Sequence, residues 1–295
     1  MLRFITLILL SGLFFADVGR ADEGFFDSGG VKIYYRVEGK GEPVLLIHGF
    51  ATNAYYQWVY PGVFRALAKD HRVIALDVRG HGRSDKPTEI DKYGTEMVED
   101  AVRLLDHLQI EKAHVIGYSM GALITGKLLT MHPDRLLSAT LGGTGIFPHG
   151  AKLPPFYDKL ADSLEEGKGL GPLVEALAPP GKTADAYAST IKLLNRSLVG
   201  DNGKALAAVV RSWKKLTVSK EQLKNNKVPT LALIGANDPL KDTLDHIKND
   251  MANLEVVVLD GTDHITTYFS PKFTRQLRKF LNEHKSSPPK NKPRP

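Results

Sequence analysis

The stretch that decides the fold of this chain runs Ala113-His114-Val115-Ile116-Gly117-Tyr118-Ser119-Met120-Gly121. An apolar, strand-like run leads into the pattern G-x-S-x-G, and a helix-like run, residues 122–129, follows it. This strand–turn–helix context is typical of a nucleophile elbow, a sharp turn that projects a serine hydroxyl above the edge of a sheet. The flanking glycines suit such a turn, because a β-carbon at either position would collide with a neighbouring strand or helix. We therefore predict that Ser119 is a nucleophile.

A serine hydroxyl needs a base that takes its proton and an acid that orients the base. The chain supplies both in the order serine, aspartate, histidine. Asp238 follows the apolar run 228–234, and His264 follows the apolar run 254–259, so each lies just beyond the carboxyl end of a predicted strand. Open parallel sheets build their sites at that edge. Chain order favours Asp238 as the acid, with three nearby carboxylates as alternatives: Asp242, Asp260 and Asp263.

Two further motifs extend the resemblance of this chain to a known family. Residues 44–50, Val-Leu-Leu-Ile-His-Gly-Phe, look like a strand followed by an oxyanion loop, and residues 77–84 read D-x-R-G-x-G-x-S. Together with the elbow, these motifs resemble the α/β-hydrolase family over nearly the whole chain beyond its first residues. We interpret His48 as a support of the oxyanion loop. Asp77 and Arg79 are interpreted as a local ion pair or turn clamp.

The resemblance implies a role for each motif residue. Ser119 is implied as the nucleophile, His264 as the general base and then acid, and Asp238 as the residue that orients His264. It also implies that the main-chain N–H groups of Phe50 and Met120 form the oxyanion hole. Donors fixed in advance toward a developing oxyanion lower the barrier by roughly 3–4 kcal/mol each. The N–H of Met120 has a further advantage, since it opens the predicted helix after the elbow, where the helix dipole favours negative charge.

The alternation of strand-like and helix-like runs predicts an α/β fold, with a mostly parallel sheet flanked by helices on both faces. An early antiparallel strand is expected at 31–37. The other expected strands are 44–47, 72–77, 113–118, 136–141, 228–234 and 254–259. The expected helices are 61–69, 95–109, 120–131 and a last helix with Ser270 as its N-cap and Pro271 at its first position.

The alternation stops between the strands at 136–141 and 228–234. Helical segments are expected near 156–166, 170–178, 183–199 and 203–216, which predicts an inserted helical cap at 146–226. The α/β-hydrolase core then comprises residues 22–145 and 227–284. Most apolar cap residues must bury the cap, and a minority line an acyl pocket. The candidates for the pocket are Leu173, Leu177, Leu198 and Trp213. The alternative is that the segment Ala51–Trp58 determines which acyl chain is preferred.

The two ends of the chain differ in composition from the rest. Residues 1–21 combine a positive start, an apolar run and small residues at the end, which predicts a signal peptide cleaved after Ala21 or Ala16. The apolar run is too short to span a bilayer, which takes about 20 residues, so we expect an exported protein, periplasmic or secreted, without stable membrane insertion after cleavage. Residues 285–295 contain four basic residues, four prolines and no acidic residue. That composition predicts a disordered basic tail.

Composition excludes several classes of function. The chain has no cysteine, so it forms no disulfides, metal–thiolate sites or thiol nucleophile. It has neither an H-E-x-x-H motif nor another dense histidine–carboxylate metal cluster. The net charge of +6 is concentrated in the tail, and no nucleic-acid-binding motif accompanies it. We therefore expect no metal, no cofactor and no nucleic-acid partner.

The leading hypothesis is an exported serine hydrolase that cleaves a carboxylic ester, or a related acyl bond, of a small or lipid-like substrate through an acyl-enzyme. A carbon–carbon bond hydrolase or a perhydrolase of the same fold is the alternative, since fold does not fix the substrate. A non-catalytic ligand-binding or sensor protein that retains the hydrolase pocket is a further alternative. The family resemblance argues against dehalogenases and epoxide hydrolases, because those members use aspartate where this chain has Ser119.

Overall fold

The computed structural model describes residues 22–150, 153–178 and 184–286 of the 295-residue chain. The predicted signal peptide, residues 1–21, lies outside the described residues, as does the predicted basic tail apart from Lys285 and Ser286. Within the described ranges, no helix combines the length and the apolar character needed to cross a membrane.

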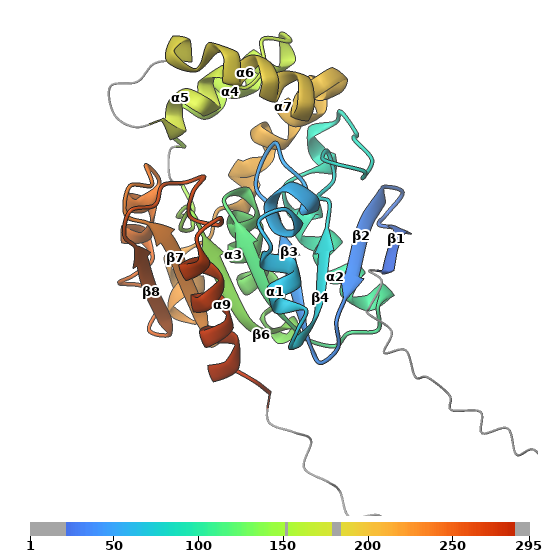
Figure 1. The fold of residues 1–295 in the computed structure, drawn as a ribbon, viewed down its shortest axis with the longest axis vertical. Coiled ribbons are helices and arrows are strands. Elements are labelled where there is room, and N and C mark those ends of the chain that lie inside the picture. Colours follow the sequence, from blue (N-terminus) through green and yellow to red (C-terminus); the bar gives the residue numbers. More distant parts are fainter. Residues whose placement is uncertain (1–21, 151–152, 179–183, 287–295) are drawn as a thin grey trace, which may run out of the picture.

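A single eight-stranded sheet runs through the described core, in the spatial order β1-β2-β4-β3-β5-β6-β7-β8 (Figure 1). β2 pairs antiparallel with both β1 and β4, whereas every pairing from β4 through β3 to β8 is parallel. The predicted mostly parallel α/β sheet is therefore confirmed. The strands are β1 (Asp22–Asp27), β2 (Lys32–Glu38), β3 (Glu42–Ile47), β4 (His71–Leu76), β5 (Ala113–Tyr118), β6 (Leu136–Gly142), β7 (Thr230–Gly235) and β8 (Leu254–Leu259).

Helices cover both faces of the sheet, and the side chains of each central strand alternate between the two cores. Val44 and Leu46 of β3 pack into the core under α1 and α9, while Leu45 and Ile47 pack into the core under α2 and α3. Figure 1 shows α1 and α9 together on the near face. The helices are α1 (Val63–Leu67), α2 (Thr95–His107), α3 (Met120–Met131) and α9 (Pro271–Glu283). The predicted start of α9 is confirmed, because the Ser270 side chain accepts from Lys272 N–H and Pro271 is the first residue.

The segment between β3 and α1 differs from the helix expected at 61–69. A five-residue π-helical turn, η1 (Tyr55–Val59), comes first, closed by a 2.8 Å hydrogen bond from Tyr60 N–H to Tyr55 O. Gly62 follows with φ 84°, a conformation that favours glycine, and separates η1 from the short helix α1. Single π-turns are rare and frequently lie at functional sites, so this unpredicted element bears on the site described below.

The inserted segment forms a layer of helices above the carboxyl ends of the strands (Figure 1). Its two stems are paired: Val218 N–H donates to Phe147 O over 3.0 Å, and His149 N–H donates to Val218 O over 2.8 Å. The α-helices between the stems are α4 (Phe156–Glu165), α5 (Gly171–Leu177), α6 (Ala188–Leu194) and α7 (Gly203–Ser212), and α8 (Lys220–Lys224) follows the second stem. The shorter turns of the segment are η4 (Ala184–Tyr187), η5 (Asn195–Val199), η6 (Gly200–Asn202) and η7 (Trp213–Leu216).

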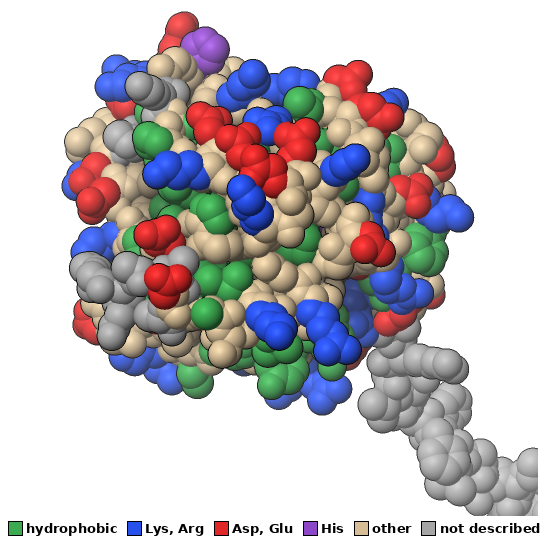
Figure 2. All heavy atoms as spheres, turned by 90° about the horizontal axis from the view of Figure 1, so that it is seen from above, with side chains coloured by type: hydrophobic (Ala, Val, Ile, Leu, Met, Phe, Trp, Pro, Cys, Tyr) green, Lys and Arg blue, Asp and Glu red, His purple; other side chains and the backbone are tan. Residues whose placement is uncertain are grey.

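Charged side chains of both signs intermingle on the outer face of this helical layer (Figure 2). Arg211 of α7 illustrates the arrangement, since its guanidinium pairs with Asp162 at 2.9 Å and with Glu165 at 2.5 Å, both on α4. Exposed ion pairs of this kind contribute little to stability. The layer is held instead by apolar residues that α4 and α7 bury between them, such as Leu160, Leu164 and Leu206.

The interpretation of Asp77 and Arg79 as a local ion pair is wrong. Arg79 reaches Asp100 of α2, at 2.7 Å through Nε and 2.6 Å through Nη2, and both side chains are buried. Asp77 acts as a turn clamp, because its carboxylate accepts from Ala54 N–H and Arg83 N–H, each over 2.8 Å. The sequence did not reveal the pair, since Arg79 and Asp100 lie 21 positions apart on different elements.

Candidate active site

Ser119 lies at a sharp turn between β5 and α3. Its φ and ψ are 53° and −117°, a backbone conformation that costs a non-glycine residue of order 1–3 kcal/mol. A β-carbon on Gly117 would lie 2.0 Å from Gly121 O, and one on Gly121 would lie 2.1 Å from Ile47 O. The expected need for glycine at both positions is therefore confirmed. Because β5 is central in the sheet, the turn holds a partly exposed serine above the middle of the carboxyl edge.

Asp238 and His264 meet at the same edge of the sheet. Asp238 follows β7, His264 follows the neighbouring strand β8, and His264 Nδ1 lies 2.9 Å from Asp238 Oδ2. Both residues are 4% exposed, so solvent screens the pair little. The other carboxylate oxygen, Oδ1, accepts from Leu240 N–H over 2.9 Å. The aspartate is thus fixed at both oxygens and holds Nδ1 of the imidazole, which leaves Nε2 free to face a substrate.

The three alternative carboxylates lie elsewhere. Asp242 is exposed within the 3₁₀ turn η8 (Lys241–His246), and Asp260 is exposed just after β8. Asp263 Oδ1 accepts from the N–H groups of Ile265 and Thr266 over 3.0 and 2.8 Å, so it caps its own turn. Partial burial raises the pKa of Asp263, but these hydrogen bonds outweigh burial and bring it below its usual value. Of the four candidates, only Asp238 is hydrogen-bonded to His264 in the described structure.

Tyr118 joins the elbow to the histidine loop, a role that the sequence pattern did not indicate. Its hydroxyl donates to the main-chain oxygen of His264 over 2.7 Å, and the two rings lie 5.5 Å apart. Burial, and then the charge of Asp238, raises the pKa of Tyr118 well above its usual value, so the hydroxyl stays protonated and able to donate. The residue before the nucleophile therefore anchors the loop that carries the imidazole. Its signal in the sequence was an aromatic hydroxyl at the variable position of G-x-S.

The loop after β3 lies beside the elbow, where a β-carbon on Gly49 would approach Ser119 Cβ to 3.4 Å. His48 Nδ1 contacts Gly49 O at 2.7 Å, and Val78 N–H donates to His48 Nε2 over 2.9 Å. Burial lowers the pKa of His48 to about 4, so its ring is neutral near pH 7, with Nδ1 as the donor. The expected support of this loop by His48 is confirmed.

The orientation of the Phe50 N–H follows from this contact. In a planar trans peptide the C=O and N–H groups point in opposite directions. His48 engages Gly49 O, which belongs to the same peptide as Phe50 N–H, and so holds that N–H pointing away from the His48 ring. Met120 is the first residue of α3, where an N–H has no acceptor within its own helix. Both proposed oxyanion donors thus belong to rigidly held backbone next to Ser119.

One contact of a catalytic triad is missing from this arrangement. The hydrogen bonds within the described part of the chain do not include one between Ser119 Oγ and His264 Nε2. Such bonds are often long in free enzymes and tighten when substrate binds.

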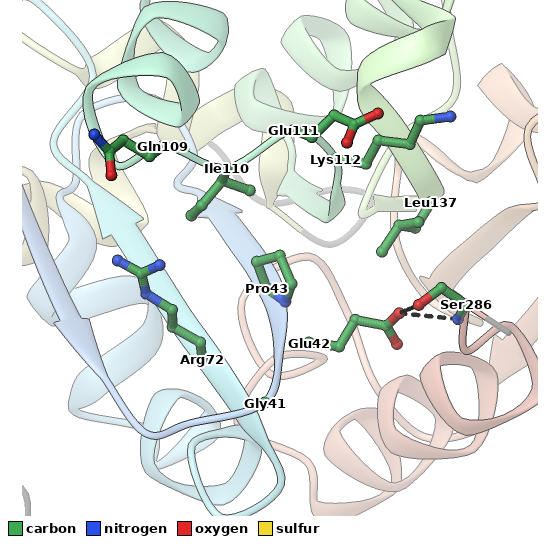
Figure 3. A pocket seen from close by; sticks show the side chains of 10 residues that line it. All are labelled: Gly41, Glu42, Pro43, Arg72, Gln109, Ile110, Glu111, Lys112, Leu137 and Ser286. Atoms are coloured by element: carbon green, nitrogen blue, oxygen red, sulfur yellow. Dashed lines mark hydrogen bonds between the residues drawn. The ribbon is translucent and has the colours of Figure 1, made fainter. Parts of the chain in front are cut away.

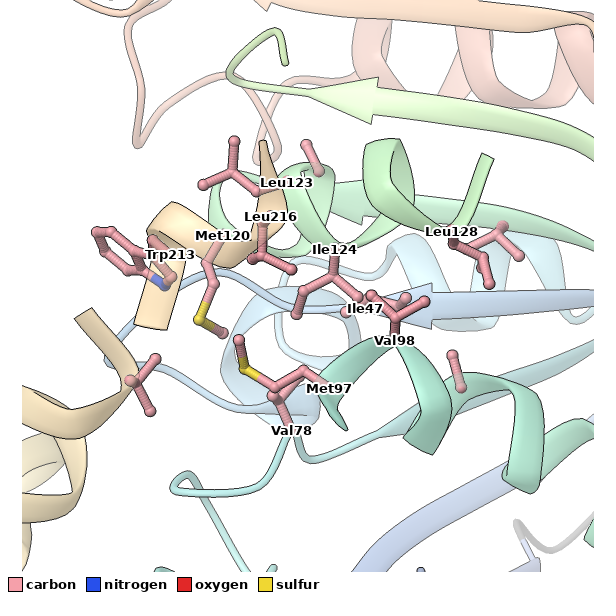
Figure 4. Packing of buried hydrophobic residues seen from close by; sticks show 14 of the residues in the cluster. Ile47, Val78, Met97, Val98, Met120, Leu123, Ile124, Leu128, Trp213 and Leu216 are labelled. Carbon is pink, nitrogen blue, oxygen red and sulfur yellow. The ribbon is translucent and has the colours of Figure 1, made fainter. Parts of the chain in front are cut away.

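Trp213 of η7 connects the helical layer to the oxyanion loop. Its ring meets the ring of Phe50 edge to face at 5.2 Å, and Phe50 meets His81 in the same way at 5.5 Å. Figure 4 shows Trp213 beside Met120, in a cluster that continues through Leu216. One buried indole therefore packs against both residues whose N–H groups are the expected oxyanion donors.

Comparison with known proteins places this geometry in a family. A sequence model described as the alpha/beta hydrolase fold matches residues 42–271, which is more than half of the chain. The chain belongs to the alpha/beta hydrolase fold family. The suspected resemblance is therefore confirmed.

Relatives of this alpha/beta hydrolase carry diverse names. It is 38% identical over 126 residues to a dihydrolipoyllysine-residue acetyltransferase component of an acetoin cleaving system from Pseudomonas putida, covering 43% of this chain and 31% of the relative. It is 30% identical over 128 residues to a bifunctional epoxide hydrolase 2 from Rattus norvegicus, covering 43% and 23%. A 2-hydroxymuconate semialdehyde hydrolase from Pseudomonas sp. is 30% identical over 171 residues, covering 57% and 56%. The chain thus spans less than two thirds of the length of each.

Solved structures match over more of the chain. A 2-hydroxy-6-oxo-6-phenylhexa-2,4-dienoate hydrolase from Rhodococcus sp. superposes with a TM-score of 0.71 at 24% identity, covering 90% of this chain and 99% of that one. An enol-lactonase from Burkholderia xenovorans superposes with a TM-score of 0.72 at 22% identity, covering 88% and 100%. At such identities the likeness establishes the fold, and the activity has to be argued from the site.

A hollow of about 580 Å³ lies at the other edge of the sheet (Figure 3). Its walls come from the amino ends of strands β3, β4 and β6 and from the segment before β5, so it opens away from the elbow. Glu42 lies in this hollow and accepts from Ser286 N–H over 2.9 Å. The described residues contain no group of three or more histidine or acidic side chains that could hold a metal ion, in this hollow or at the elbow.

Proposed function

We propose that this hydrolase is a serine enzyme that cleaves a carboxylic ester through an acyl-enzyme. The observation that carries the proposal is the buried 2.9 Å contact between His264 and Asp238, at the sheet edge where the strained elbow presents Ser119. An acid that fixes the tautomer of a histidine, at the same sheet edge as a serine in a strained turn, is the set of groups that activates a hydroxyl for attack.

The proposed reaction has two halves. In the first, Ser119 Oγ attacks the ester carbonyl while His264 Nε2 takes its proton, and the tetrahedral oxyanion accepts from Phe50 N–H and Met120 N–H. The imidazolium, stabilised by Asp238, then protonates the leaving alcohol. In the second half, water gives its proton to His264 and attacks the acyl-serine, which releases the acid and restores the hydroxyl. No step calls for a cofactor.

The nucleophile, the relatives and the covering helices each bear on the type of bond that is cleaved. Serine as the nucleophile supports an acyl substrate over an epoxide, because the resemblance associates epoxide hydrolysis with an aspartate nucleophile. Carbon–carbon bond hydrolysis is the second candidate, since a relative named 2-hydroxymuconate semialdehyde hydrolase is similar over 57% of this chain. We favour a small or lipid-like ester because helices with apolar inner faces, such as α4 and α7, cover the carboxyl edge.

Labelling with a fluorophosphonate probe tests the activated serine directly. We expect the wild-type protein to react and Ser119→Ala to be inert. His264→Ala should lose turnover as completely as Ser119→Ala, and the double variant should be no worse, because the triad works as a unit. A panel of nitrophenyl esters of graded chain length, with amide and thioester analogues and a vinylogous diketone, then identifies the bond. Absence of labelling in a folded wild-type protein would overturn the proposal.

We further propose that the protein is exported, with the signal peptide removed near Ala21. Amino-terminal sequencing of protein recovered from a bacterial envelope or the medium should give a start near Asp22. Recovery of the intact Met1 terminus in a membrane fraction would contradict the export proposal.

A further inference from the structure

Gln57 is a buried polar residue close to the elbow that the proposed reaction does not use. It lies in the π-turn η1, is 3% exposed, and its main-chain N–H donates to Asn53 O over 3.0 Å. Asn53 also closes the turn through its side chain, which accepts from Tyr56 N–H over 3.0 Å. The carboxamide of Gln57 is therefore carried by a short element with several fixed backbone contacts.

The carboxamide reaches the oxyanion loop. Gln57 Oε1 accepts from Gly49 N–H over 3.4 Å, which is long for such a bond. The position that a β-carbon of Gly49 would occupy lies 3.2 Å from Gln57 Oε1 and 3.4 Å from Ser119 Cβ. Gly49 thus lies between the carboxamide and the proposed nucleophile, and a β-carbon there would make a tight contact with Gln57 Oε1.

Two side chains together hold the two successive peptides of this loop. Gln57 engages the N–H of the peptide between His48 and Gly49, and the His48 ring engages the C=O of the peptide between Gly49 and Phe50. The second of these peptides carries the Phe50 N–H. The two peptides share the α-carbon of Gly49, whose two soft torsions let them rotate separately, so both contacts are needed to fix the pair.

The other end of the carboxamide has no partner. Gln57 Nε2 is buried and makes no hydrogen bond within the described part of the chain. A buried donor without an acceptor lowers stability, and an apolar side chain of the same shape avoids that cost. Packing alone would therefore favour methionine or leucine here. The presence of an amide with an unpaired N–H group is better explained by the hydrogen bond that its oxygen accepts from Gly49 N–H.

We propose that Gln57 is a positioning residue of the oxyanion hole, which fixes the peptide before Gly49 while His48 fixes the next one, so that the Phe50 N–H stays aimed at the oxyanion. The inference rests on the proposed serine-hydrolase function. It assigns Gln57 no contact with substrate. Its contribution belongs to the transition state, because the oxyanion forms only there.

Two substitutions of Gln57 separate positioning from packing. Gln57→Met keeps the length of the side chain but removes both the acceptor oxygen and the unpaired N–H group. Gln57→Asn keeps the amide but withdraws it by one methylene and leaves a small cavity. We expect kcat on nitrophenyl acetate to fall about tenfold to a hundredfold in both variants, with KM nearly unchanged. The melting temperature should hold or rise in Gln57→Met and fall in Gln57→Asn.

A purely structural role predicts that kcat follows the melting temperature, so full kcat in Gln57→Met would overturn the inference. Gln276→Met provides a chemistry-matched control, since Gln276 is a partly exposed residue of α9. The control should leave kcat unchanged. If the wild-type protein shows no Ser119-dependent turnover, the proposed function is wrong. If the wild type turns over and Gln57→Met keeps its kcat, only the role of Gln57 is wrong.

Discussion

Replacement of Trp213 by alanine should lower both stability and catalysis, because this side chain packs against both the helical layer and the oxyanion loop. It is 4% exposed and lies against Tyr157 of the helical layer, with ring centres 5.0 Å apart. It also lies against Phe50 of the oxyanion loop at 5.2 Å. The sequence had offered Trp213 as a candidate wall of the acyl pocket or as part of the buried core of the cap.

The size of the effect follows from burial. Truncation of a fully packed tryptophan to alanine costs about 3–5 kcal/mol, which includes the transfer of the indole and the cavity left behind. For a protein of this size, about 2–4 °C of melting temperature corresponds to each kcal/mol. We therefore expect Trp213→Ala to lower the melting temperature by at least about 6 °C. Trp213→Phe should cost less, because a ring remains for both edge-to-face contacts and the indole N–H, which is buried without an acceptor, is removed.

Catalysis supplies the sharper test. If Trp213 holds Phe50 and Met120 in place, kcat on the smallest acetyl ester should fall about tenfold or more in Trp213→Ala at a temperature where the variant is folded. A residue that only lines an acyl pocket would change the preferred chain length and leave the acetyl ester unaffected. Leu193→Ala is the control, since Leu193 of α6 is 63% exposed and its removal should change the free energy of unfolding by less than about 0.5 kcal/mol. Unchanged acetyl-ester kcat in folded Trp213→Ala would refute the coupling.

Further outcomes are expected at other positions. Asp238→Asn should lower kcat by about 10³–10⁴ by presenting the wrong tautomer of the histidine, with an unchanged circular dichroism spectrum. Asp263→Asn should keep most of the activity, and the reverse order of these two rates would show that the acid is misassigned. Asp100→Ala should cost about 3–5 kcal/mol in urea denaturation, since it leaves the buried guanidinium of Arg79 with only the longer 3.9 Å pair to Glu96, and a loss below 1 kcal/mol would contradict this account. Burial lowers the pKa of His48 from 6.5 to about 4, so the unfolded chain binds more protons between these values. The contribution of His48 to stability is therefore complete above pH 6.5 and is lost as the pH falls to about 4, by about 3 kcal/mol; urea denaturation that shows no loss across this window would contradict it.

Structural features that are encoded by a short contiguous stretch of residues could be predicted from the sequence. The elbow was predictable because its glycines, serine and flanking runs are contiguous, and each glycine is required by a clash within a few ångströms. The last helix was predictable for the same reason, since Ser270 and Pro271 specify its first turn. The order of Asp238 and His264 along the chain carried over to adjacent strands, because β7 and β8 are consecutive in both sequence and space.

Features that depend on distant partners were not predictable. The partner of Arg79 is Asp100, which in the sequence looked like an ordinary acidic residue in the first turns of a helix. β1 was not expected because an edge strand pairs on one side only, and its residues, Asp22–Asp27, are mostly exposed and lack a clear apolar alternation. The burial of His71, which is 1% exposed at the start of β4, likewise has no signal in the local sequence. In each case the burial and the partner of the residue depend on elements that are distant in the sequence, so the residue type alone does not predict them.

Because the two stems of the inserted segment are paired with each other, the helices between them can be exchanged without changing the sheet below. The chain leaves the sheet after β6 and returns at Val218, where two hydrogen bonds join it to residues on either side of Pro148. The ends of an insertion of some seventy residues are therefore already closed, and the entropy of closing a loop grows only slowly with its length. Helices could be lengthened, shortened or exchanged between these stems without altering the register of any strand. A chain built this way can acquire a new substrate preference by recombination at two neighbouring points, while the serine, aspartate and histidine stay on the part that is left untouched.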